Sequence, residues 1–270
     1  MTDWLALCRD ATAAVERALT ELPTRLEREP VVGDGEGGDE TTAIDAAAES
    51  GVVGLLEEVH SRGETFTLVS EELGERSFGS EELRVILDPI DGSLNAKRGI
   101  PFFSVSIAIA DGPAMKDVFF GYVFDFGTLE EWTARRGEGA FLNGAALAGP
   151  GPKEEIEVLS LEATRTDLVA ERVAHMVGFA DRTRVMGSLA LSLCHLAAGR
   201  VDAVCSLKGA RSVDIAAAQL LVRERGLAID LPEAPPFGDA PLDLEARSRI
   251  VAAGTDELCA GLYERLSASH

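Results

Sequence analysis

The segment that most constrains this chain is residues 84–93, RVILDPIDGS, in which an apolar strand runs directly into two aspartates. Asp88 and Asp91 stand three residues apart at the strand end, and Pro89 makes the turn between them rigid. This placement directs both carboxylates toward one point, where two close anions need either a cation or a proton. A rigid set of oxygen ligands is typical of Mg²⁺ sites, which also use water and substrate phosphate.

The residues that follow complete this pattern. The carbonyl of Ile90 is a further candidate ligand, and Gly92 and Ser93 begin a predicted short helix whose free N–H groups can hold an anion. Carboxylates for a metal beside amides for a phosphate are the minimum required for metal-assisted phosphoryl transfer. The alternative is an aspartate-rich turn that does no more than cap a helix.

Three further acidic positions strengthen the first interpretation. Glu71 follows another short strand, Asp45 lies in the first turn of a predicted helix, and Asp214 begins a predicted helix in the second half. Each also has an ordinary alternative as a surface acid or as an acid that favours a helix N-terminus. Spacing along the chain does not show whether these positions meet in space.

Strands and helices mix along the chain, which predicts a layered α/β or α+β fold. The Gly-Pro-Gly-Pro sequence at 149–152 predicts a boundary between an N-terminal half, 1–150, and a C-terminal half, 151–270. The hydrophobic spacing predicts helices over 3–28, 43–59, 167–177, 189–198 and 213–225, with a last helix capped by Thr255. Strands are predicted at 65–70, 84–87, 102–110, 118–124, 130–134, 157–160, 203–206 and 249–253, and a loop at 231–243.

Charge and composition restrict the partners. Asp and Glu number 46 against 25 Lys and Arg, a net charge of −21, so we expect neither nucleic acid nor an anionic membrane surface as a partner. No apolar run approaches the length of a membrane span, and the first residues lack the basic start of a secretion signal. Four scattered cysteines favour a reducing cytoplasm. The excess of Arg over Lys indicates either adaptation to high salt or a codon bias.

Residues 33–38 satisfy the pattern G-x-G-x-x-G of dinucleotide-binding turns. That interpretation requires a strand before the glycines, whereas a long helix is predicted there. Asp34, Glu36 and Asp39 would also repel a pyrophosphate. We therefore interpret the segment as a flexible acidic loop.

Taken together, the motifs resemble the inositol monophosphatase family. The collinear matches cover most of the chain: GDETTAIDAAAE at 38–49, SEE at 70–72, DPIDGS at 88–93, GEGAFLNG at 137–144, GSLALSLCHLAAGRVDA at 187–203 and SVDIAAA at 212–218. The resemblance implies an α-β-α-β-α layered sandwich, with the active site between the halves near strand ends. It also implies a homodimer.

The resemblance further implies a phosphatase that hydrolyses phosphate monoesters by metal-activated water, without a covalent intermediate. It implies two or three Mg²⁺ ions, with ligands Glu71, Asp88, Asp91, Asp214 and the Ile90 carbonyl. Glu71 and Ser93 would orient the water, and Asp45 would hold a further water. The implied substrate-binding residues are Asp91, Gly92, Ser93, Gly187, Ser188, Lys208 and Arg211.

Departures from the animal members of the family bear on the substrate. Ser93 stands where those enzymes usually have Thr, Val213 stands where they have Trp, and the stretch 207–211 lacks their inositol-gripping acid. The chain looks more like the archaeal branch, which commonly hydrolyses both inositol monophosphate and fructose 1,6-bisphosphate. Lys208 and Arg211 favour a bisphosphate, unless they are ordinary surface charges. Two alternatives stay open: a 3′-phosphatase of adenosine 3′,5′-bisphosphate, and a non-catalytic member that binds inositol phosphates or regulates a partner.

Overall fold

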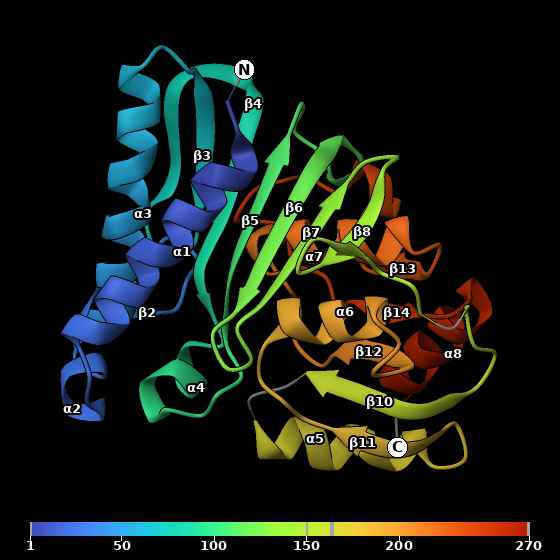
Figure 1. The fold of residues 1–270 in the computed structure, drawn as a ribbon. Helices are drawn as coiled ribbons and strands as arrows, with labels where there is room; N and C mark the ends of the chain where they lie inside the picture. The colour runs from blue at the N-terminus through green and yellow to red at the C-terminus, as the bar shows by residue number, and fades with distance from the viewer. Residues whose placement is uncertain (1, 150, 163–164, 269–270) are drawn as a thin grey trace.

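The computed structural model describes residues 2–149, 151–162 and 165–268, which contain a large sheet, a smaller sheet and a short hairpin (Figure 1). The large sheet has the order β3 (Phe66–Ser70), β4 (Gly74–Asp91), β5 (Ser104–Ala110), β6 (Val118–Asp125), β7 (Glu130–Arg135), β8 (Gly139–Leu142) and β9 (Ala145–Ala146). The small sheet has the order β11 (Ala180–Arg184), β10 (Ile156–Glu162), β12 (Ala203–Ser206), β14 (Val251–Ala253) and β13 (Ala228–Asp230). The hairpin pairs β1 (Val31–Asp34) with β2 (Glu40–Thr42).

The helices separate and cover these sheets (Figure 1). One face of the large sheet carries α1 (Trp4–Glu21) and α3 (Ala43–Ser61), with α2 (Arg25–Arg28) and α4 (Ser93–Arg98) at its end. Between the two sheets lie α6 (Leu189–Ala197) and α7 (Ser212–Glu224), and the far face of the small sheet carries α5 (Thr166–Val173) and α8 (Asp256–Ser267). Short 3₁₀ turns occupy Met115–Asp117, Ala174–Met176 and Phe237–Asp239. The predicted α-β-α-β-α sandwich is confirmed.

Burial of apolar surface holds the layers together. One cluster joins α1 and α3 to the large sheet, and another joins α8 to the small sheet. The third cluster contains α6 and α7 together with residues of both sheets, such as Trp132 and Val204. The predicted boundary at 149–152 falls between β9 and β10, and residue 150 of it lies outside the described residues. The two halves therefore share one hydrophobic core across the middle layer.

The predicted helix at 3–28 is wrong in one respect, because α1 stops and a separate single turn, α2, follows. Pro23 explains the interruption, since the residue before a proline disfavours the helical conformation. The guanidinium of Arg28 then donates to the carbonyls of Leu19 and Leu22 and satisfies the end of α1.

Most other predicted elements are confirmed within a few residues, and several strands were missed. β4 begins ten residues before the predicted strand at 84–87, and Ser70 of β3 pairs with both Gly74 and Leu87 of that long strand. The hairpin β1–β2 was predicted as a loop, and β9, β11 and β13 were not predicted. Among the described helices, none combines the length and the apolar character required to cross a membrane.

Candidate active site

The aspartate motif lies at the C-terminal end of β4, which runs between β3 and β5 of the large sheet. Asp88 is 1% exposed and Asp91 is 8% exposed. Asp88 Oδ1 accepts the backbone N–H of Ile90 at 2.9 Å, and Ser93 Oγ donates to the Ile90 carbonyl at 2.9 Å. These short-range bonds fix the turn, so the two carboxylates leave the strand in defined directions.

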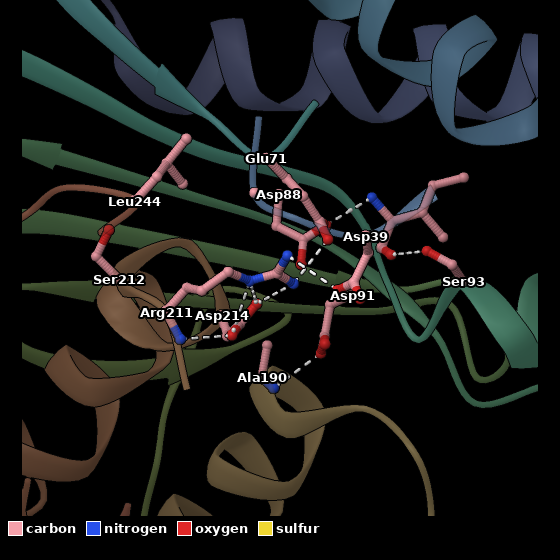
Figure 2. A network of polar contacts seen from close by, with 12 residues as sticks. Asp39, Glu71, Asp88, Asp91, Ser93, Ala190, Arg211, Ser212, Asp214 and Leu244 are labelled. Atoms are coloured by element: carbon pink, nitrogen blue, oxygen red, sulfur yellow. Dashed lines mark hydrogen bonds and ion pairs between the residues drawn. The ribbon is translucent and has the colours of Figure 1, made fainter. Parts of the chain in front are cut away.

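Two more carboxylates reach the same place from other elements. Glu71 follows β3, and Asp214 lies in the first turn of α7. Both contact Nη2 of Arg211, Glu71 Oε1 at 2.6 Å and Asp214 Oδ1 at 2.8 Å. Figure 2 shows these side chains and those of Asp88 and Asp91 turned toward one another. The predicted ligands therefore converge, although they are separated by up to 143 positions of sequence between Glu71 and Asp214.

The N-terminus of α6 holds Asp91. Ser188 Oγ and the backbone N–H of Ala190, the latter at 2.8 Å, both donate to Asp91 Oδ2. Ser188 also caps α6 and is almost fully buried. Its hydroxyl thus supports a proposed metal ligand, whereas the sequence placed Ser188 among the substrate contacts. Gly187, the other member of that prediction, immediately precedes this cap.

Asp45 approaches from the first turn of α3. Its Oδ2 accepts the backbone N–H of Thr42 at 3.2 Å and the Thr42 hydroxyl, which closes a capping box. Its Oδ1 is buried and has no hydrogen-bond partner among the described residues. A buried carboxylate oxygen without a donor is costly. Such an oxygen fits a site that receives a hydrated cation.

Burial and mutual repulsion raise the pKa values of three acids of this site. Burial raises the pKa of Glu71 to about 8, with Asp214 and Glu72 adding to the rise and Arg211 opposing it. Burial raises the pKa of Asp91 to about 7, against the hydrogen bond from Ser188. Burial, followed by the charges of Glu71 and Asp91, also raises the pKa of Asp88 well above its usual value. A divalent cation would relieve this repulsion, and an all-oxygen donor set fits Mg²⁺.

Arg211 and Lys208, the two cations predicted to bind substrate, differ in their surroundings. Arg211 is directed into the carboxylates, where it pairs with Glu71, Asp214 and, at 3.4 Å, Asp39. The side chain of Lys208 is exposed. Arg211 therefore contacts the proposed metal ligands themselves, and its role toward a second phosphate stays a prediction.

The glycine-rich segment at 33–38 packs against the site. Gly37 N–H donates to the Glu71 carbonyl at 2.8 Å, and Arg247 donates to the Gly37 carbonyl at 2.9 Å. A Cβ on Gly37 would meet Arg211 Nη1 at 2.8 Å, so a glycine is needed for this approach. The sequence had indicated a flexible acidic loop; the structure instead pairs its flanks as the hairpin β1–β2 and ties the turn to Glu71 and Arg247. The rejection of a dinucleotide turn stands, since strand β2 and not a helix follows the last glycine.

Two buried acids beside the site were missed. Glu49 accepts from the Ser70 hydroxyl and, at 3.0 Å, from the backbone N–H of Leu73, which supports the turn carrying Glu71. It stands one helical turn after Asp45 on the same face of α3, and this spacing could have identified it. Glu162 ends β10, and no local pattern distinguishes it.

A separate group of close potential ligands lies at the end of β6. The ligand atoms of Asp125, Glu130 and His195 lie within 4.8 Å of one another. Arg200 pairs with Glu130 through two contacts of 2.6 Å, and Thr128 donates to Asp125 at 2.7 Å. The hydrogen bonds from Arg200 lower the pKa of Glu130. Three acids of the first group have raised pKa values instead, so the first group is the stronger candidate for a cation.

Known proteins resemble this chain along most of its length. The model of the inositol monophosphatase family matches residues 5–269. A fructose-1,6-bisphosphatase/inositol-1-monophosphatase of Methanothermobacter thermautotrophicus is 34% identical over 266 residues, covering 94% of this chain and 93% of that protein. Its counterpart in Archaeoglobus fulgidus is 34% identical over 254 residues, covering 93% of both. Human inositol monophosphatase 2 is 32% identical over 76% of this chain and 71% of its own length.

A solved structure has the same fold. The crystal structure of an inositol monophosphatase-fructose 1,6-bisphosphatase superposes with a TM-score of 0.84 and 26% sequence identity, covering 98% of this chain and 100% of that chain. The similarity extends over both sheets, so it includes every element that carries a residue of the candidate site.

Proposed function

The chain belongs to the inositol monophosphatase family, and on that premise we propose that it is a Mg²⁺-dependent phosphatase of small sugar or polyol phosphates. The observation that carries this proposal is the convergence of four carboxylates, the buried Asp88 and Asp91 of β4 and the partly buried Glu71 after β3 and Asp214 of α7. Burial, with the charges of neighbouring acids, raises the pKa values of Glu71, Asp88 and Asp91, and a bound cation would relieve this repulsion.

Glu71, Asp88, Asp91, Asp214 and the Ile90 carbonyl would hold two or three Mg²⁺ ions. Bound there, Mg²⁺ neutralises charge on the phosphoryl group and acidifies the attacking water. Neutralising the negative charge of the phosphoryl group is the main requirement for catalysis, because phosphate monoesters hydrolyse extremely slowly in water.

The chain's own groups would place the reactants. The N–H groups of Gly92 and Ser93 open α4 and have no acceptor within the helix, so they can donate to phosphate oxygens. Ser93 Oγ lies 2.9 Å from the Ile90 carbonyl and, with Glu71, would orient the attacking water. The unpartnered oxygen of Asp45 would accept from a second water. These groups bind and orient, so hydrolysis needs no covalent attachment to the protein.

For the substrate we propose fructose 1,6-bisphosphate, inositol 1-phosphate or both. The archaeal relatives that match along nearly the whole chain carry both activities in their names. The stretch 207–211 has no acid to grip inositol hydroxyls and contributes the cations Lys208 and Arg211. A second phosphate would gain charge-assisted contacts from such cations.

A substrate panel tests the proposal. Phosphate release is measured from fructose 1,6-bisphosphate, inositol 1-phosphate and adenosine 3′,5′-bisphosphate, each with Mg²⁺ and with EDTA. We expect Mg²⁺-dependent release from one or both of the first two. Release from the adenosine compound alone would favour the nucleotide phosphatase, and a folded, Mg²⁺-binding protein that hydrolyses none of them would favour a non-catalytic member.

We also propose a homodimer in a reducing, cytoplasmic compartment. The family resemblance supports the dimer, and the four cysteines are free and buried, which suits a compartment without disulfides. Light scattering on a sizing column should give twice the chain mass of 28.6 kDa. A mass of one chain across the accessible concentration range would contradict the dimer.

A further inference from the structure

One peptide bond next to the site is held from both of its sides. It joins Met186 to Gly187 in the turn that leads into α6. Its carbonyl accepts from Asn95 Nδ2 of α4 at 2.8 Å, and its N–H donates to Glu162 Oε2 at the end of β10 at 2.9 Å. Because both polar groups of the peptide are bonded, its plane is fixed between the two halves of the molecule.

Glu162 provides the anchor on the C-terminal side. It is 7% exposed, and its Oε1 accepts from the hydroxyls of Ser192 at 2.7 Å and Ser160 at 2.9 Å. Both carboxylate oxygens therefore have donors, as a buried carboxylate requires. Glu162 is not among the proposed catalytic or ligand residues, so its buried carboxylate must serve a different role.

The fixed peptide controls the approach of α6 to Asp91. Gly187 has a φ of +90°, a left-handed conformation that turns the chain into the helix cap at Ser188. Ser188 Oγ then donates to Asp91 Oδ2. The N–H of Ala190 donates to the same oxygen (Figure 2). The direction of the first turn of α6 thereby sets the direction of the Asp91 carboxylate.

We propose that Glu162 is a positioning residue for the metal site. Its carboxylate fixes the Met186–Gly187 peptide, the peptide fixes the first turn of α6, and that turn orients the Asp91 carboxylate toward the cation. Groups that orient metal ligands in this way commonly change metal affinity without touching the metal. The inference rests on the proposed function, because Asp91 is a ligand only if Mg²⁺ binds there.

Calorimetric titration of Mg²⁺ into the full chain and its variants tests this role. Glu162→Ala removes the acceptor of the Gly187 N–H, and we expect the Kd for Mg²⁺ to rise about tenfold or more. Glu162→Gln keeps an acceptor for Gly187, since the serine hydroxyls can turn to accept from its amide, and its Kd should stay within about threefold of wild type. Ser160→Ala is the matched control. It removes a donor to the other oxygen of Glu162 and should leave the Kd within about twofold.

A double variant tests the route through α6. If Glu162 acts through this turn, Glu162→Ala should add little to the loss in Ser188→Ala, because both changes break one chain of contacts. Additive losses would overturn the inference. So would an equal loss in Glu162→Gln and Glu162→Ala, which would indicate that the charge of Glu162 acts directly.

Thermal unfolding distinguishes a variant that binds Mg²⁺ weakly from one that does not fold. Thermal unfolding in EDTA identifies a variant that does not fold, and Glu162→Asp, whose shorter side chain withdraws from Gly187, then replaces Glu162→Ala with the same expected rise in Kd. An unchanged Kd in a folded Glu162→Ala or Glu162→Asp protein overturns the positioning role. A wild-type chain that binds no Mg²⁺ contradicts the proposed function instead, so the two failures are distinguishable.

Discussion

Replacing Arg211 by glutamine should destabilise the protein in EDTA and strengthen its binding of Mg²⁺. The guanidinium donates to Glu71 at 2.6 Å and to Asp214 at 2.8 Å, and these oxygens belong to the proposed Mg²⁺ ligands. Arginine and the metal therefore compete for the same carboxylates. Loss of the arginine removes, among the described residues, the ion-pair partner of Glu71 and Asp214, and Mg²⁺ would then meet less competition.

The exposure of the groups sets the size of the effect. The side chains of Arg211, Glu71 and Asp214 are 12 to 14% exposed. Removing one partner of a buried ion pair costs about 3–5 kcal/mol, and partial exposure favours the lower end. A loss of about 3 kcal/mol would lower the thermal midpoint in EDTA on the order of 6–10 °C. If saturating Mg²⁺ restores half of it, the Kd for Mg²⁺ falls about tenfold.

Thermal unfolding with EDTA and with Mg²⁺, together with calorimetry, measures both effects. Arg136→Gln is the matched control, because Arg136 pairs with Asp111 on the exposed surface. Its loss should be at most about 1 kcal/mol and the same with and without Mg²⁺. An equal drop in midpoint under both conditions for Arg211→Gln, or weaker Mg²⁺ binding, would refute the competition between Arg211 and the metal.

Three further predictions concern substrate, salt and pH. Arg211→Ala should lower kcat/KM for fructose 1,6-bisphosphate about ten- to a hundredfold through loss of a charge-assisted contact, with a much smaller change for inositol 1-phosphate; equal losses on both substrates would contradict a contact to the second phosphate. The thermal midpoint should rise steeply from dilute buffer to molar KCl, since a net charge of −21 repels itself, and a flat profile would leave codon bias as the explanation. In EDTA the midpoint should fall as the pH rises from 5 to 8, because folded Glu71 and Asp91 keep protons, with pKa values of about 8 and 7, that the unfolded chain has released. A rising or flat midpoint over that range would show that burial does not hold these protons, whereas saturating Mg²⁺ should remove the slope.

Most helices and strands could be predicted because local patterns determine them, whereas their α-β-α-β-α layer order came from the family resemblance. The apolar stripe of residues 43–59 and the apolar runs at 104–110 and 118–125 each identify an element from its own neighbours. The first half of β4 was missed because residues 74–83 are mostly polar and gain their strand conformation by pairing with β3. Pro23 was a visible signal, and the long apolar spacing around it obscured the break.

Some residues of the candidate site could likewise be predicted from local patterns, and others could not. Asp88, Asp91 and Ser93 could be proposed because one continuous motif carries them. Glu71 and Asp214 were weak candidates from their positions alone, and the family resemblance gave them a ligand role. The pairing of Arg211 with those acids could not be predicted, since spacing does not say which way a long side chain turns. Glu162 gave no signal because Gly187, its partner, lies 25 residues away in sequence.

The measurement that tests the central claim most directly is Mg²⁺-dependent phosphate release by the wild-type chain and Asp91→Asn. The substitution removes one negative charge from the proposed ligand set and keeps the size of the side chain. We expect wild type to release phosphate from fructose 1,6-bisphosphate or inositol 1-phosphate with Mg²⁺ and not with EDTA. Asp91→Asn should retain the fold by circular dichroism and lose at least about a hundredfold in kcat. Near-normal activity in the folded Asp91→Asn protein would contradict the account.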